Sequence, residues 1–229
     1  RLAALPHGAA RRTLALRIKL KATRLARQTQ EALDTARLLG KHRAFSADAA
    51  QSIVRGLAIE LINSAHDTSQ LQQTWLQLEQ LERNMPELAI QAAQRLVNLG
   101  GEPAQARTWL LPVWERMVQL PNALPDHHAL KLVRALESGL DTLDAAWLAR
   151  IESAQLANPR DARLQYLAGV ACLKRQLWGK AQQLLTQAIP HLTDAGLRAS
   201  AWRHLAALAE RRNDGEAAAE AWKKAALAH

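Results

Sequence analysis

The stretch AQQLLTQA, residues 181–188, has a small, a large and a small residue at positions i, i+4 and i+7, and AAEAWKKA, residues 218–225, repeats that spacing. On a helix these positions share one face, where small side chains let a second helix approach closely and the large one fills the remaining space. The spacing recurs in six segments, with steps of 34 to 41 residues, that begin at Ala32, Leu71, Ala106, Trp147, Ala181 and Ala218. A period in this range predicts an array of helix–turn–helix units, and such arrays usually bind other proteins rather than catalyse reactions.

The composition favours helix along the whole chain. Hydrophobic residues make up 48% of the sequence and aromatic residues only 4%, while Ala, Leu, Gln, Arg and Glu abound. No segment alternates apolar and polar residues between turn signals, so we expect no sheet. The predicted fold is all-α, a solenoid of about six helical hairpins, with pairs at 9–26 and 28–40, 46–66 and 68–82, 87–99 and 103–119, 126–139 and 144–157, 160–174 and 177–189, and 194–212 and 215–228.

Local signals predict where these helices begin and how the chain is divided. N-caps are expected at four side chains that can accept a backbone N–H, Ser46, Asp126, Asp144 and Asp214. Pro121 and Pro125 disfavour helix between them. We predict a single solenoid domain over residues 1–229, and a hinge at 120–126 between two halves is the alternative.

The net charge of +9 is concentrated at the amino end, because residues 1–43 hold 11 Lys or Arg and two acids. Seven of these cations occur in a run without any acid: Arg11, Arg12, Arg17, Lys19, Lys21, Arg24 and Arg27. Residues 1–27 are predicted to form a basic amphipathic helix. Leu14, Ile18, Ala22 and Leu25 share one face of it, and Arg17, Lys21 and Arg24 share the adjoining face.

Three interpretations of this basic segment remain open. It can be a solvated helix face, a segment just cytoplasmic of a membrane anchor that is attracted to anionic lipid headgroups, or an arm that binds nucleic acid. Nucleic-acid binding is the least favoured, because no aromatic residue precedes Phe45 to stack on bases. The chain begins at Arg1 rather than Met, so we expect a membrane anchor to precede it.

The carboxy-terminal part resembles tetratricopeptide repeats. Residues 158–161, Asn-Pro-Arg-Asp, form a proline turn that opens a unit, and Gly169 and Ala181 take the small positions of its two helices. The last unit matches the large and small positions with Trp202, Leu205, Ala206, Ala218, Trp222 and Ala225. The sequence departs from the pattern at Gln165 and Cys172, where aromatic residues are usual. The resemblance implies a right-handed superhelix in which the first helix of each unit lines a concave groove.

Longer stretches are similar to the proteobacterial HemY-like family: residues 31–39 with 41–46, residues 159–161 with 164–169 and 176–181, and residues 201–210. This resemblance covers the whole chain. It implies a non-enzymatic scaffold at the bacterial inner membrane, on the cytoplasmic side, that is associated with late porphyrin and protohaem synthesis. The implied partners are membrane-associated enzymes of haem synthesis, beside an anionic lipid surface contacted by the basic amino end.

The tetratricopeptide pattern also implies a partner-binding groove in the last two units, lined by Arg163, Tyr166, Lys174, Arg203 and Arg211. Such a groove suits an acidic or carboxylate-ended peptide, and the alternative is that these are solvated charges. Arg37 and Arg150 lie on second helices, so we expect them on the outer face.

No motif for catalysis, phosphate binding or metal binding occurs in the chain, so no catalytic or metal-ligating residue is predicted. The single cysteine, Cys172, is expected to be buried in helix packing. We expect no cofactor, but haem needs only one axial histidine and an apolar slot. Two functional alternatives to the scaffold therefore stay open: a haem or porphyrin carrier with a histidine ligand, and an adaptor with an RNA-binding basic arm.

Overall fold

Almost every stretch predicted to be helical is a helix in the computed structural model, which describes residues 7–119 and 123–228. Contacts divide the chain into two units, unit 1 (Arg1–Gly101) and unit 2 (Glu102–His229). The helices of unit 1 are α1 (His7–Leu25), α2 (Thr29–Lys41), α3 (Ala47–Ser64), α4 (Thr68–Gln77), α5 (Gln80–Arg83) and α6 (Pro86–Asn98). Those of unit 2 are α7 (Pro103–Gln119), α8 (Asp126–Glu137), α9 (Ala145–Ala157), α10 (Ala162–Lys174), α11 (Trp178–Ala188), α12 (Ala195–Arg211) and α13 (Gly215–Leu227), with 3-10 turns η2 (Leu140–Thr142) and η3 (Ile189–His191).

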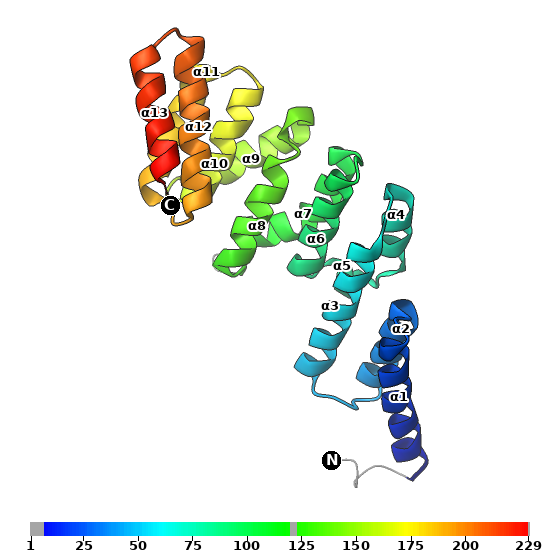
Figure 1. The fold of residues 1–229 in the computed structure, drawn as a ribbon. Helices are drawn as coiled ribbons and strands as arrows, with labels where there is room; N and C mark the ends of the chain where they lie inside the picture. The colour runs from blue at the N-terminus through cyan, green and yellow to red at the C-terminus, as the bar shows by residue number, and fades with distance from the viewer. Residues whose placement is uncertain (1–6, 120–122, 229) are drawn as a thin grey trace. The chain divides into compact units, whose positions relative to one another are not determined.

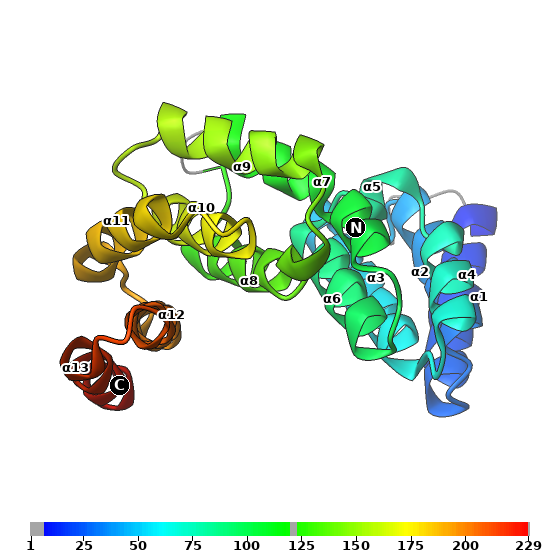
Figure 2. The ribbon, with the colours of Figure 1, turned by 90° about the horizontal axis from the view of Figure 1, so that it is seen from above.

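Within each unit, neighbouring helices pack against one another in chain order (Figure 1). In unit 1, α2 packs between α1 and α3, and α3 also contacts α4 and α6. In unit 2, α10 is the central helix and contacts α8, α9, α11 and α12, while α12 pairs closely with α13. Figure 2 shows α10 with α11 and α12 with α13 as adjacent hairpins. The predicted all-α class of helical hairpins is confirmed, and the right-handed superhelix stays a prediction.

The i, i+4 and i+7 positions of the six segments form the helix-packing core of both units. Seventeen of the eighteen predicted positions are buried, among them Ala181, Leu185 and Ala188, each with 0% of its surface exposed. The exception is Trp222 on α13, which is 42% exposed and donates its indole N–H to Glu210 Oε1 at 2.7 Å. Its expected place in the core is wrong, because its side chain stays partly exposed beside α12, where Glu210 accepts its indole N–H.

The predicted helix starts depend on side-chain caps. Ser46, Asp144 and Asp214 each accept a backbone N–H from the residue three positions later, at 3.3, 2.7 and 3.0 Å, so these caps are confirmed. The predicted cap at Asp126 is wrong: Pro125 takes the cap position and Asp126 is the first helical residue. The rigid φ of proline suits that position, and the carboxylate still lies in the first turn, where the helix dipole favours negative charge.

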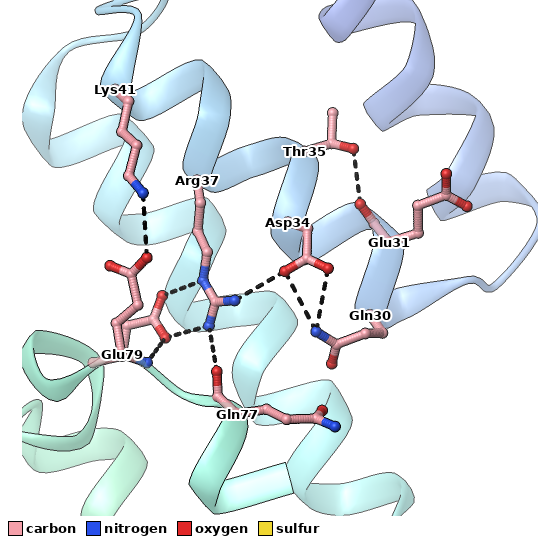
Figure 3. A network of polar contacts seen from close by, with 9 residues as sticks. Gln30, Glu31, Asp34, Thr35, Arg37, Lys41, Gln77 and Glu79 are labelled. Atoms are coloured by element: carbon pink, nitrogen blue, oxygen red, sulfur yellow. Dashed lines mark hydrogen bonds and ion pairs between the residues drawn. The ribbon is translucent and has the colours of Figure 1, made fainter.

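The helix predicted over 68–82 is broken at Leu78, whose backbone is extended while its side chain is buried. The break lets Arg37 of α2 hold the start of α5 (Figure 3). Its guanidinium donates to both carboxylate oxygens of Glu82, at 2.9 and 2.6 Å, and to the carbonyl of Gln77 at 3.2 Å. The Glu82 hydrogen bond is the largest of the effects that raise the pKa of Arg37, and it outweighs the opposing effect of burial. The expectation that Arg37 lies on an outer face is wrong, because its side chain is only 14% exposed.

In unit 2, a buried arginine holds the connection between α8 and α9. Arg107 of α7 is 2% exposed and donates to the carbonyls of Gly139 and Thr142, at 2.6 and 2.7 Å. Burial lowers its pKa, and Asp144 at 3.9 Å opposes that effect. The predicted hinge at 120–126 lies partly outside the described residues, so it stays a prediction, and the boundary between the two units falls between Gly101 and Glu102.

Candidate functional site

A basic groove lies between the carboxyl end of α10, the start of α11 and the second half of α12. Two adjoining cavities, of about 320 and 170 Å³, share Trp178, Leu208 and Arg211 in their walls. We call them together the Trp178 groove, and its remaining lining residues are Leu173, Lys174, His204, Ala207 and Arg212. No aspartate or glutamate is among these lining residues.

The groove combines an apolar wall with fixed cations. Trp178 is the first residue of α11, and the Arg211 guanidinium carbon lies 4.7 Å from the centre of its ring. Stacking on an aromatic face leaves the in-plane N–H groups of an arginine directed outward from its edge. Arg212 donates to Gln182 Oε1 at 2.5 Å, and the Lys174 ammonium is paired with Asp141. Leu208, at 4% exposed, helps to anchor this half of α12 in the core.

His204 connects the groove to a partly buried carboxylate on α8, Glu137. Its Nε2 lies 3.6 Å from Glu137 Oε1, and the Tyr166 hydroxyl donates to the same oxygen at 2.5 Å. Burial by itself would raise the pKa of Glu137, but the hydrogen bonds from His204 and Tyr166 and the nearby charges outweigh it, so this pKa lies below its usual value. Burial, followed by the negative charge of Glu137, raises the pKa of Tyr166 far above its usual value. The cluster is a structural support, because it joins α8, α10 and α12.

The structure separates the residues that the sequence assigned to one groove. Lys174 and Arg211 both line the Trp178 groove. Arg203 is exposed and donates to the Ser200 hydroxyl at 2.7 Å. Tyr166 does not line a groove: its exposure is 0%, so its assignment as a contact residue is wrong. The small residues of this array bring α8, α10 and α12 close enough to enclose its ring, and Glu137 satisfies its hydroxyl.

Arg163 lies at the opposite end of α10. It is paired with Asp161 at 3.0 Å and with Asp126 at 3.1 Å, and these contacts, led by the Asp161 hydrogen bond, raise its pKa. It lines a separate cavity of about 520 Å³, together with Asp126, Asp161 and Asp194. Because three carboxylates share that cavity with its cations, it is less suited to an anionic ligand than the Trp178 groove.

Trp178, His204 and Arg212 are groove residues that the tetratricopeptide pattern of the sequence did not predict. Trp178 is half-buried at the start of α11, and its ring forms the platform under Arg211. One feature of the sequence pointed to this groove: two adjacent arginines, Arg211 and Arg212, lie just before the turn at residues 213–215. Which side of α12 faced α11 could not be told from that spacing.

The predicted membrane-proximal cations lie on or next to α1 and differ in their contacts. Five of them have exposed side chains: Arg11, Arg12, Lys21, Arg24 and Arg27. Arg17 donates to the Ala44 carbonyl at 2.5 Å and stacks over Phe45, while Lys19 pairs with Glu31 at 2.8 Å. Arg17 is therefore mainly a tether between α1 and the residues that follow α2.

The described residues hold no group of three or more His, Cys, Asp or Glu that could bind a metal ion, and no helix among them is long and apolar enough to cross a membrane. Cys172 is fully buried, and burial raises its pKa, so its thiol is poorly suited to reaction.

Two solved structures have a similar arrangement of helices. One is MamA, residues 41 to the end, from Desulfovibrio magneticus RS-1, with 21% sequence identity, a TM-score of 0.48 and coverage of 78% of this chain and 94% of that one. The other, the MamA RS-1 ArsTM double mutant, gives 21% identity, a TM-score of 0.47 and coverage of 78% and 93%. No protein-family model and no curated protein sequence matches the chain. A likeness at this level assigns the chain neither a family nor a function.

Proposed function

We propose that this protein is a non-enzymatic interaction scaffold whose Trp178 groove binds an acidic or carboxylate-ended segment of a partner protein. The observation that carries this proposal is the lining of the groove, in which Arg211 lies beside an aromatic platform and no lining residue is acidic, while the Asp141 that pairs with Lys174 lies outside the lining. Helical-hairpin arrays of this kind usually present extended surfaces to other proteins. The small residues pack the helices against one another, so the exposed side chains determine which partner binds.

The recognition chemistry follows from the positions of the side chains. Arg211 is held by its stack on Trp178, so its planar fork can pair with a carboxylate through two hydrogen bonds at little entropic cost. An apolar side chain of the same partner segment can pack on Trp178, Leu173 and Ala207. An arginine and an aromatic side by side are the residue types that most often dominate the energy of protein interfaces.

Two arginine–tryptophan stacks in unit 2 allow a matched experiment. Arg211→Gln removes the charge beside Trp178, whereas Arg150→Gln removes the charge that lies 5.8 Å from the centre of Trp147 on α9. The probe is a fluorescein-labelled peptide of six glutamates with a free carboxy terminus, and binding is followed by fluorescence anisotropy. We expect Arg211→Gln to weaken binding by about tenfold, which corresponds to one lost charged hydrogen-bond pair, and Arg150→Gln to leave it unchanged.

The controls for this experiment are a hexalysine peptide and the glutamate peptide with an amidated carboxy terminus. Binding of hexalysine, or equal losses in the two arginine variants, contradicts the assignment of the Trp178 groove as an anion-binding site. A loss on amidation alone identifies the terminal carboxylate as the group that the groove recognises.

The HemY-like resemblance supports a finer proposal. We propose that the partners are membrane-associated enzymes of late porphyrin and protohaem synthesis, and that the protein works at the bacterial inner membrane on its cytoplasmic side. Affinity purification of the full-length protein from gently solubilised membranes, followed by mass spectrometry, tests this. Enrichment of haem-synthesis enzymes that is lost with Arg211→Gln supports the proposal, and a partner set without any of them contradicts it.

We further propose that the scaffold works without a resident haem. The histidine that lines the Trp178 groove, His204, is already engaged by Glu137, which leaves its ring poorly placed for an axial bond. Titration of the protein with haem, followed by the Soret band, tests this. A stoichiometric Soret shift that is lost when one histidine is replaced indicates the haem carrier instead.

A further inference from the structure

Helix α1 carries apolar side chains on two opposite sides, and only one side is packed. Thr13, Leu20 and Thr23 are buried where α1 meets α2. On the other side, Leu14, Ile18 and Leu25 are 56%, 62% and 78% exposed. At 3.6 residues per turn these three side chains lie within about 40° of one another around the helix axis. They form a continuous apolar stripe, which we call the α1 stripe, running along the helix opposite α2.

Cations border the α1 stripe along one edge and at its amino end. Lys21 and Arg24 follow that edge, Arg11 lies within about 20° of Ile18 near the amino end of the stripe, and Arg12 lies about 120° from Ile18, toward the packed side. All four are exposed, and no aspartate or glutamate occurs before Glu31. The two acids that the sequence offers nearby, Glu31 and Asp34, are engaged by Lys19 and by Arg37. The exposed surface of α1 therefore has an apolar stripe with cations along one edge and at its amino end, and no acid beside it.

We propose that α1 lies in the plane of an anionic membrane surface, with the α1 stripe inserted between lipid chains and its flanking cations among the headgroups. A helix with this cross-section matches the lipid interface, where an apolar layer lies directly below a layer of negative charge. The proposal concerns unit 1 and does not depend on the Trp178 groove.

Other partners match this surface less well. The phosphate backbone of a nucleic acid would satisfy the cations, but it offers nothing apolar to cover Leu14, Ile18 and Leu25, and α1 has no aromatic side chain to stack on bases. A second copy of the chain would bring two positive faces together without intervening acids. An acidic amphipathic helix of another protein could satisfy both features, and the experiment below separates it from a membrane because it contains lipid only.

The first measurement is co-sedimentation of the full chain with vesicles of phosphatidylcholine alone or of equal parts phosphatidylcholine and phosphatidylglycerol. We expect binding to the anionic vesicles only. The triple variant Leu14→Gln, Ile18→Gln, Leu25→Gln should bind more than about tenfold more weakly, because the apolar area available for insertion is lost. The double variant Leu76→Gln, Leu81→Gln is the matched control, since these leucines of unit 1 are 71% and 79% exposed and α4 and α5 lack such a cation cluster.

The second measurement distinguishes insertion from surface attraction. A polarity-sensitive fluorophore is attached through Ile18→Cys or, as the control, through Leu81→Cys, and the buried Cys172 leaves the introduced thiol as the reactive one. We expect a blue shift on anionic vesicles for the probe at position 18 only. The variant Arg11→Gln, Arg12→Gln, Lys21→Gln, Arg24→Gln should reduce binding at low salt and make the remainder insensitive to added salt.

Several outcomes overturn the proposal. In the first, the charge variant abolishes vesicle binding, the apolar variant leaves it intact, and the probe at position 18 shows no blue shift. Helix α1 would then bind the membrane through its charge alone, without insertion. Another is equal loss in the apolar variant and its matched control. A third is the absence of vesicle binding by the wild-type chain with intact helical content, which would leave a protein or nucleic-acid partner as the occupant of the α1 stripe.

Discussion

At the scale of single residues, the side chains assigned to one groove from the sequence have separate roles. Tyr166 is buried and donates its hydroxyl to Glu137. Arg163 forms ion pairs with two aspartates, whereas Lys174 and Arg211 line the Trp178 groove. A helix register gives the direction of a side chain but not whether a neighbouring helix covers it. Burial of Tyr166 depends on α8 and α12, which lie far from it in the sequence.

The partly buried carboxylate of Glu137 predicts a dependence of stability on pH. Its pKa in the folded protein lies below the unfolded value of 4.5, so ionised Glu137 contributes stability above that value. This contribution is lost as the pH falls through the folded pKa. Glu137→Gln should therefore lower the urea midpoint at neutral pH, and the difference from wild type should shrink below about pH 4.5. A difference that is constant between pH 7 and pH 3, measured by circular dichroism, would contradict this assignment.

At the scale of helix pairs, two helices can approach closely only where small residues lie between them. An added Cβ at Gly169 of α10 would lie 2.8 Å from Leu185 Cγ of α11, whereas one at Gly179 would meet nothing within 4 Å. We expect Gly169→Ala to destabilise the protein by about 1–3 kcal/mol, because the packed Leu185 must shift. Gly179→Ala, inside the first turn of α11, should be neutral or slightly stabilising. Equal urea midpoints for the two variants would show that α10 and α11 can separate at no cost.

The contact between α2 and α5 gives a second prediction at this scale. Glu82 has a side chain only 5% exposed, and Arg37 is its cationic partner. Arg37→Ala should cost about 3 kcal/mol, because it leaves a buried carboxylate without its charge partner. The control is Arg55→Ala, whose partner Glu87 is 25% exposed in a pair open to water, and we expect a loss below about 1 kcal/mol. Chemical denaturation measures both, and similar losses would mean that the Glu82 carboxylate finds another partner.

At the scale of the whole molecule, the division at Gly101–Glu102 predicts that unit 2 can fold by itself. Its central helix α10 finds all of its close neighbours within residues 102–229. We expect a fragment of residues 102–229 to keep its helical circular dichroism, unfold cooperatively and bind the glutamate peptide with the affinity of the full chain. A fragment that is helical but unfolds without a transition would indicate that the repeats are stabilised only as one continuous array.

The sequence by itself determined the helices and the packing positions. Periodic small residues and side-chain caps act within one or two helical turns, so 17 of the 18 core positions and three of the four caps could be predicted locally. The break at Leu78 was missed because it depends on Arg37, which is 41 residues away and satisfies the carbonyl and carboxylate that the break exposes. Only the tertiary structure decided which cations are exposed and can contact a partner. It buried Tyr166, stacked Arg211 on Trp178 and left the α1 stripe uncovered, because each of these outcomes depends on which side of a helix its neighbours occupy.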